Sequence, residues 1–530
     1  MGNGSYKKEM RIIMNSIFKN LPVLLSILSI VASSNINASE KLPAHDKLKP
    51  PFNVDLIIDD KNKRPVNRKV LGNNVQWVDH GDEILKRGEL SFIEDKVTKA
   101  KRMGVTVLRY PGGSLADLYH WKDGIGSKKS RKKNSRFHGQ GDDTILFGTA
   151  EFLTLTTKLN AEPLITVNIA SGNAKEAADW VKLTNITRIK DKTGTLLPRV
   201  KYWEIGNEPY LIGDEHKELA MMPEEYARRA NLFIKSMKAV DPSIVVGIPL
   251  RSDTLGGTPA TPLQGFNVKV LKNMTQPFEY VSLHNAYFPY IWESVPDINT
   301  LYLSAMSASK FVKEDIEHTK KQLKEFFPNR NINIAITEYN AFFTIGKGKS
   351  DGYISSKLGA LYVADMLALF SNMQDILMAN YWSLSGNWFF GTIRQDNKLR
   401  PSYYVLEGFN RVLRGDILSI DIKSPTFKNK KAGFISKTDD IPLITAVVTS
   451  QDKSIRAFII NKHLQKSANL KFKLNDSVKV DSMKMQKLLT DRFIKSDDVD
   501  SKGWTSFEII KNNTVNIPPH SMVIVEMQKK

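Results

Sequence analysis

Short apolar runs alternate with longer amphipathic stretches between about residue 67 and residue 411. Each run is followed by enough chain for a helix, which is the pattern of a parallel sheet with helical crossovers. Eight such runs predict strands at residues 70–75, 105–110, 163–168, 200–205, 244–248, 280–284, 332–337 and 378–383. Eight strand–helix units predict an α/β fold, a (β/α)8 TIM barrel over residues 67–411. A doubly wound sheet is disfavoured because no glycine-rich phosphate turn follows the first run.

The pattern changes after Gly415 to short strands with alternating apolar positions, such as residues 443–448 and 455–460, separated by turn residues. Short alternating strands of this kind are typical of a β-sandwich, which we predict at residues 412–530. Residues 52–58 alternate in the same way but precede the barrel. We therefore expect residues 39–66 to contain a linker and an N-terminal strand that joins the sandwich.

The N-terminus has the features of a secretory signal peptide over residues 1–38. Lys7, Lys8, Arg11 and Lys19 precede an apolar run at residues 21–32, and Ala38 is a suitable cleavage point. An uncleaved anchor is the weaker alternative, because a membrane span needs about 20 apolar residues. We expect a secreted or periplasmic protein with no membrane association after cleavage.

The amino-acid composition excludes several classes of protein. The chain of 530 residues is 41% hydrophobic and 25% charged, as in soluble globular proteins, and it has no cysteine. The absence of cysteine excludes disulfides, thiolate metal sites and a cysteine nucleophile.

The net charge of +20 predicts attraction to anionic material such as an acidic glycan. Residues 127–136 concentrate this charge in a loop after the second predicted strand, although a solvated surface loop is the alternative interpretation. Nucleic acid is not an expected partner, because no zinc-finger spacing or RNA-binding motif is present.

Two predicted strands end on a glutamate. Residues 203–209 read Trp-Glu-Ile-Gly-Asn-Glu-Pro, and residues 334–340 read Ile-Ala-Ile-Thr-Glu-Tyr-Asn. Counting strands places Glu208 after the fourth and Glu338 on the seventh, so both face the barrel mouth. Glycosidic cleavage needs two carboxyl groups that flank the bond, and a separation of about 5–5.5 Å gives retention of configuration. These glutamates are the predicted catalytic pair.

Five further residues at strand ends are candidates for substrate binding: Arg109, Asn207, His284, Tyr287 and Trp382. The arginine can hold the Glu338 carboxylate ionised through charge-assisted hydrogen bonds. The asparagine can bind a sugar hydroxyl, the histidine and tyrosine can contact the sugar and Glu338, and the indole can stack on a sugar ring. Each also has a structural alternative: an ion pair, a turn former or core packing.

Several blocks carry a resemblance to known enzymes. Leu-Arg-Tyr-Pro-Gly-Gly stands at residues 108–113 and Tyr-His-Trp-Lys-Asp-Gly-Ile-Gly at residues 119–126, and further blocks lie at residues 147–152, 162–168, 177–180, 206–208, 337–340, 401–404 and 518–521. In these blocks the chain resembles glycoside hydrolase clan A, most closely the family 51 α-L-arabinofuranosidases. The resemblance implies a barrel with a β-sandwich, a retaining mechanism without metal or cofactor, Glu208 as the acid/base and Glu338 as the nucleophile.

Two positions depart from the family pattern. Gln76 stands where the family has a glutamate, and Ser114 where it has an asparagine, and the resemblance implies that both positions hold sugar hydroxyls. The reaction type is unaffected, but the departures weaken the sugar assignment, because polar contacts discriminate between sugars. A glycosidase for acidic polysaccharides, similar to endo-β-glucuronidases, and an inactive glycan-binding protein are the alternatives.

Overall fold

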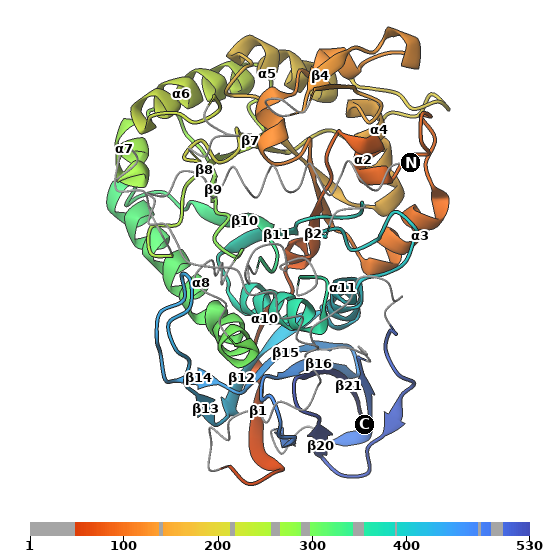
Figure 1. Ribbon diagram of the computed structural model, residues 1–530, viewed down its shortest axis with the longest axis vertical. Coiled ribbons are helices and arrows are strands. Elements are labelled where there is room, and N and C mark those ends of the chain that lie inside the picture. The colour runs from red at the N-terminus through yellow and green to blue at the C-terminus, as the bar shows by residue number, and fades with distance from the viewer. Residues whose placement is uncertain are drawn as a thin grey trace, which may run out of the picture.

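The computed structural model describes residues 48–136, 141–211, 218–255, 265–287, 297–342, 354–386, 389–474, 479–488 and 502–530. The predicted signal peptide lies outside these residues. A barrel with surrounding helices occupies the upper part of Figure 1, and a sheet-rich part built from β1 and the C-terminal strands occupies the lower part.

Eight parallel strands close into a barrel in the order β10-β11-β2-β3-β6-β7-β8-β9. They are β2 (Gly72–Asn74), β3 (Val107–Tyr110), β6 (Glu162–Val167), β7 (Tyr202–Ile205), β8 (Val245–Pro249), β9 (Tyr280–Ser282), β10 (Asn333–Tyr339) and β11 (Ile376–Tyr381). Each of the eight predicted runs overlaps one of these strands. The predicted TIM barrel is therefore confirmed.

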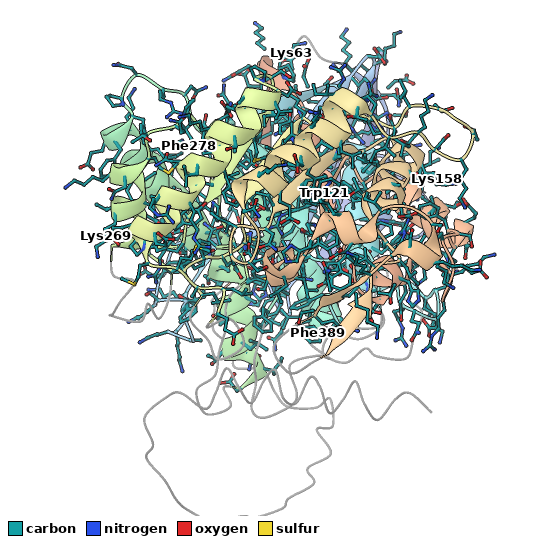
Figure 2. All side chains as sticks on the ribbon, turned by 90° about the horizontal axis from the view of Figure 1, so that it is seen from above. Lys63, Trp121, Lys158, Lys269, Phe278 and Phe389 are labelled. Atoms are coloured by element: carbon teal, nitrogen blue, oxygen red, sulfur yellow. The ribbon has the colours of Figure 1, made fainter. Side chains whose placement is uncertain are left out.

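Helices cover the outside of the barrel. They are α3 (Glu94–Met103), α4 (Thr149–Leu159), α5 (Ala174–Val181), α6 (Pro223–Val240), α7 (Phe266–Asn273), α8 (Ile298–Phe326), α10 (Lys357–Asn372) and α11 (Pro401–Val412). In α6, Pro223 stands in the first turn, and the helix buries Tyr226, Ala230 and Phe233 at the three- and four-residue spacing of one helix face. Helices α5 and α6 lie side by side in Figure 2.

The second part is a nine-stranded sheet in the order β19-β18-β21-β16-β15-β12-β1-β17-β20. Its strands are β1 (Phe52–Pro65), β12 (Asp416–Lys423), β15 (Ile444–Gln451), β16 (Ser454–Asn461), β17 (Ala468–Lys473), β18 (Val480–Lys487), β19 (Glu508–Ile509), β20 (Thr514–Ile517) and β21 (Ser521–Lys529). Side chains from strands across the sheet meet in one apolar core, so the sheet folds over on itself. The N-terminal strand β1 lies between β12 and β17.

The barrel and the sheet-rich part share a packed boundary. Lys462 at the end of β16 and Asp365 on α10 form an ion pair of 2.7 Å with both side chains almost fully buried. Phe409 on α11 stacks on Phe458 of β16 with ring centroids 4.1 Å apart. Within the described residues, no helix is long and apolar enough to cross a membrane.

Candidate active site

The barrel interior changes from apolar to polar within two residues along its strands. Six buried side chains form one apolar layer: Val107, Leu164, Tyr202, Tyr280, Ala335 and Met378. Residues i and i+2 of a strand point to the same face, so the next inward layer is read two positions later. That layer is polar and buried, and it consists of Arg109, Thr166, Glu204, Ser282, Thr337 and Asn380. The site begins at this layer.

Arg109 is the centre of the polar layer. Its guanidinium is fully buried and donates from Nε to Glu204 Oε2 at 2.7 Å, from Nη1 to Glu338 Oε1 at 2.7 Å and from Nη2 to Asn207 Oδ1 at 2.8 Å. A further contact from Nη1 reaches Asn74 Oδ1 at 3.2 Å. Charge-assisted bonds of this length are strong, and the planar fork fixes the directions of its partners. The predicted contact between Arg109 and Glu338 is present.

Glu204 is a site residue that sequence reasoning missed. Its carboxylate is fully buried and accepts hydrogen bonds from Thr166 Oγ1 and Thr337 Oγ1, both at 2.8 Å. Burial would raise the pKa of Glu204, but Arg109 and these hydroxyls hold that pKa below its usual value. One feature of the sequence could have revealed Glu204 as a site residue. It is a charged residue inside an otherwise apolar strand, and it stands two positions after Tyr202, which faces the barrel interior.

Glu338 lies near the end of β10 with its side chain 7% exposed. In addition to the Arg109 bond, its Oε2 accepts a hydrogen bond from Tyr287 Oη at 2.8 Å. Burial and the charge of Glu338 raise the pKa of Tyr287 well above its usual value, so the phenol remains a donor. The Glu338 carboxylate is therefore held through both oxygens in a fixed orientation.

Glu208 faces Glu338 across an imidazole. His284 Nδ1 lies 2.9 Å from Glu208 Oε1 and 4.0 Å from Glu338 Oε1, while its Nε2 lies 2.9 Å from Thr337 Oγ1. The two carboxylate oxygens cannot be farther apart than the first two distances together. These two oxygens are therefore at most about 6.9 Å apart, a range that includes the roughly 5–5.5 Å separation of retaining glycosidases.

The two glutamates differ in their surroundings. The Glu208 side chain is 20% exposed, against 7% for Glu338. Burial opposes a charge on His284, but Glu338 and Glu208 together raise the pKa of His284 above its usual value. A more exposed carboxyl beside an imidazole suits proton exchange, and a buried, doubly held carboxylate suits attack on carbon.

Trp382 and Asn207 complete the wall of the site. A Cβ atom at Gly113 would lie 3.0 Å from Glu338 Oε1 and 3.2 Å from the Trp382 indole, so the glycine leaves room between them. The Asn207 Nδ2 group is buried without a hydrogen-bond partner among the described residues, because its Oδ1 is taken by Arg109. This Nδ2 group is a free donor at the position where a sugar hydroxyl was predicted.

Gln76 is held by an unexpected element. Its backbone N and its Nε2 donate to the two oxygens of Asp82, at 2.9 and 3.0 Å. Asp82 belongs to α2 (Asp79–Glu83), a turn in which all five residues have a left-handed backbone with φ between +48° and +72°. Left-handed turns of L-residues are costly, so this one is imposed by its surroundings. Ser114 begins a short helix, η2 (Ser114–Leu118), directly after Gly113.

The basic loop carries less free charge than its sequence suggests. Arg131 is buried and makes a double contact of 2.8 Å with Glu151, and Arg136 makes one with Asp79 at 2.9 and 3.0 Å. Lys128, Lys129, Lys132 and Lys133 are exposed. Two of the six cations therefore hold the loop in place.

Trp121 follows β3, as the basic loop does, and lies against α5. Its Nε1 donates to Glu176 O at 3.0 Å, and its ring stacks on Trp180 with centroids 5.9 Å apart. The tryptophan fixes the helix that flanks this side of the barrel. Among the described residues, no cluster of three or more His, Asp or Glu side chains is arranged to hold a metal ion.

Comparison with known proteins agrees with this geometry. The family model for the α-L-arabinofuranosidase 1 domain matches residues 99–255, which include Arg109 and Glu208. Over 400 residues the chain is 26% identical to a probable α-L-arabinofuranosidase C of Aspergillus niger, and the alignment covers 71% of this chain and 77% of that protein.

Two solved structures have the same fold. The α-L-arabinofuranosidase of Thermotoga maritima, in its arabinose complex, superposes with a TM-score of 0.76 at 23% identity, over 90% of this chain and all of that one. The family 51 α-L-arabinofuranosidase of Thermotoga petrophila gives a TM-score of 0.70 at 22% identity, over 89% of this chain and all of that one. The chain is thus similar in sequence to α-L-arabinofuranosidases and shares the fold of the solved family 51 enzymes.

Proposed function

We propose that this protein hydrolyses glycosides with retention of configuration, with Glu338 as nucleophile and Glu208 as general acid/base. The observation that carries the proposal is the pair of glutamates facing each other across His284 Nδ1, one of them held by Arg109. Retaining glycosidases use two carboxyl groups at such short separation.

In the first step, a Glu338 oxygen attacks the anomeric carbon while Glu208 gives its proton to the departing glycosidic oxygen. The bond from the anomeric carbon to that oxygen breaks, and an ester bond to Glu338 forms. Arg109 and Tyr287 keep the attacking carboxylate ionised and in line.

In the second step, Glu208 is ionised and takes a proton from water, whose oxygen attacks the same carbon and releases Glu338. His284 contacts Glu208 in the structure and supports its cycling between the two protonation states. Two displacements at one carbon restore the starting configuration.

An α-L-arabinofuranoside is the proposed substrate class. The support is the likeness to proteins named α-L-arabinofuranosidases. The free Asn207 Nδ2 group, Gln76 and Ser114 are the proposed contacts to sugar hydroxyls, and the Trp382 indole is the proposed stacking surface. Gln76 is neutral and clamped by Asp82, so the sugar preference is proposed to differ in detail from that of the relatives.

The test is chemical rescue. Glu338→Ala should abolish turnover of an aryl α-L-arabinofuranoside, and azide should restore part of it while giving a glycosyl azide of inverted configuration, because a small anion fits the vacated face. Glu526→Ala is the matched control, since Glu526 also pairs with a cation but lies in β21 of the sandwich. Wild-type turnover in Glu338→Ala would remove Glu338 from the mechanism, and no turnover by wild type on any aryl glycoside would favour an inactive glycan-binding protein.

An acidic polysaccharide remains the second candidate substrate. Its support is the net charge of +20 and the four exposed lysines of the basic loop, Lys128, Lys129, Lys132 and Lys133. Replacing these four by Gln should lower low-salt binding to polygalacturonate while leaving hydrolysis of a small neutral glycoside unchanged. Unchanged, salt-insensitive binding would leave the loop as a solvated surface.

We also propose export through residues 1–38, on the basis of the basic and apolar segments of the sequence. N-terminal sequencing of the protein recovered outside the cytoplasm should begin at Ser39. Recovery of the intact N-terminus in the membrane fraction would support the uncleaved anchor.

A further inference from the structure

Asp117 is a buried carboxylate that the proposed mechanism does not use. It lies in η2 and is 1% exposed. Its Oδ1 accepts from the backbone N of Ile169, and its Oδ2 from the backbone N of Asn207, each at 3.0 Å. One side chain therefore ties the loop after β3 to the carboxyl ends of both β6 and β7.

The segment that Asp117 holds has an unusual backbone. Gly206 has φ of +78° and Glu208 has φ of +42°, so the chain leaves β7 through two left-handed residues that flank Asn207. A left-handed backbone is unfavourable for glutamate and persists only when neighbouring contacts impose it. A Cβ atom at Gly206 would lie 2.3 Å from Ile169, so the segment is also packed tightly against the end of β6. The bond from Asn207 N to Asp117 fixes the Gly206–Asn207 peptide, one residue before Glu208.

We infer that Asp117 is a positioning residue for the acid/base, which holds the Gly206–Glu208 turn so that the Glu208 carboxyl meets His284 and the glycosidic oxygen. The inference rests on the proposed role of Glu208. Asp117 acts through the backbone and does not touch the substrate.

The cost of keeping this carboxylate supports a role beyond packing. Burial raises the pKa of Asp117 to about 7, although the backbone donors of Asn207, Ile169 and Ala170 oppose that rise. A buried ionisable group held in this way at the edge of a site is more often functional than one on the surface. A neutral side chain would have filled the same space without this penalty.

The inference makes a prediction that a purely structural role does not. A misplaced acid slows only substrates whose leaving group needs a proton, whereas general damage to the fold slows all substrates alike. The leaving-group dependence of the rate therefore separates the two roles.

The experiment compares Asp117→Asn with wild type on a dinitrophenyl and a phenyl α-L-arabinofuranoside. Asn keeps one acceptor but turns an amide N–H₂ toward a backbone N–H. We expect kcat/KM on the phenyl glycoside to fall at least 10-fold further than on the dinitrophenyl glycoside. Asp241→Asn is the matched control, because Asp241 is also buried and accepts hydrogen bonds from Ser243 and Asn185, but it ends α6 at the opposite end of the barrel. The control variant should change kcat/KM by the same factor on both substrates.

The inference would be overturned if Asp117→Asn lowered kcat/KM equally on both substrates, or lowered it on neither. Asp117→Ser, which removes the buried charge and keeps a hydroxyl, is the second variant if the first does not fold, and the same criterion applies to it. Glu208→Ala separates this inference from the proposed function. If Glu208→Ala is itself insensitive to the leaving group, the acid/base assignment fails. If the rate of Glu208→Ala depends on the leaving group but the rates of the Asp117 variants do not, only the inference about Asp117 fails.

Discussion

The barrel and the sandwich differ in the kind of residue that occupies their inward-facing positions. In the sandwich, alternate residues stay apolar over several successive inward positions, as with Phe52, Val54, Leu56 and Ile58 of β1. In the barrel the apolar layer ends after one position, and the next inward position on β7 is Glu204. Both interiors are equally inaccessible to water.

The difference shows where each part gains its stability. Apolar burial is non-directional and tolerates rearrangement, so the sandwich core depends on volume. The polar layer of the barrel depends on each charge meeting its partner, because an unpaired buried charge is costly. The sandwich is therefore expected to contribute stability, and the polar layer to contribute function at some risk to stability.

The largest expected effect comes from Arg109→Lys. A lysine cannot reproduce the fork that reaches Glu204, Glu338 and Asn207, so buried carboxylates lose their partner. We expect a loss of about 3–5 kcal/mol in unfolding free energy and a fall in kcat of at least about 100-fold. Denaturant unfolding and steady-state kinetics measure the two. A variant with wild-type kcat would show that the network is only structural.

Leu470→Ala should affect stability alone. Leu470 is fully buried in β17, opposite Val54 of β1 and Val515 of β20. The cavity should cost about 2–5 kcal/mol, while kcat of the folded protein stays at the wild-type value. Thermal unfolding and kinetics at 25 °C test this. A fall in kcat comparable to that of Arg109→Lys would show that the sandwich supports the site directly.

Tyr287→Phe should affect catalysis alone. The variant keeps the ring but removes the hydrogen bond to Glu338 Oε2, a bond to a charged group that contributes about 1.5–3 kcal/mol. We expect kcat/KM to fall about 10- to 100-fold with little change in unfolding temperature. An unchanged kcat/KM would mean that Arg109 alone orients the nucleophile.

The last prediction is a pH dependence of stability that arises in the barrel. Burial raises the pKa of Asp82 to about 7 from a usual value of 3.8, so the native state binds the proton more tightly than the unfolded state. The native state is therefore favoured below about pH 4, and this advantage is lost as pH rises toward 7, by at most about 1.4 kcal/mol per pH unit. Relative to Asp82→Asn, wild type should lose stability over that interval.

Urea unfolding at several pH values measures this difference. Leu470→Ala provides the comparison, because its destabilisation should be independent of pH. A difference between wild type and Asp82→Asn that stays constant from pH 4 to 7 would contradict the assignment.

The sequence was sufficient for the architecture and for placing the two glutamates of the proposed catalytic pair at the carboxyl ends of barrel strands. Strand periodicity and the crossovers located all eight barrel strands, with boundaries off by a few residues, as at 70–75 against β2 at Gly72–Asn74. Glu208 and Glu338 were predictable because strand ends of a barrel share one face, whatever the exact register.

Residues that act through partners could be located only in part. The contact between Arg109 and Glu338 was predicted, but the contact of Arg109 with Glu204, across 95 residues of chain, and that of Asp117 with Asn207, across 90, were not. A sequence shows that Glu204 interrupts an apolar strand, but not which side chains lie at its level, because that depends on the stagger of the closed barrel.

Local sequence was misleading where tertiary contacts override it. The basic loop reads as a free cationic patch, yet Arg131 is buried against Glu151 and Arg136 pairs with Asp79. Gly81 adopts a left-handed backbone readily and the aspartates of α2 do so occasionally, but a run of five such residues is favoured only where contacts such as that between Asp82 and Gln76 hold it. The sequence by itself thus determined the barrel, the sandwich and the two glutamates, since these depend on periodicity and strand order. Tertiary structure alone decided which charges are paired and how the glutamates are held, since these depend on distances between strands that are remote in the chain.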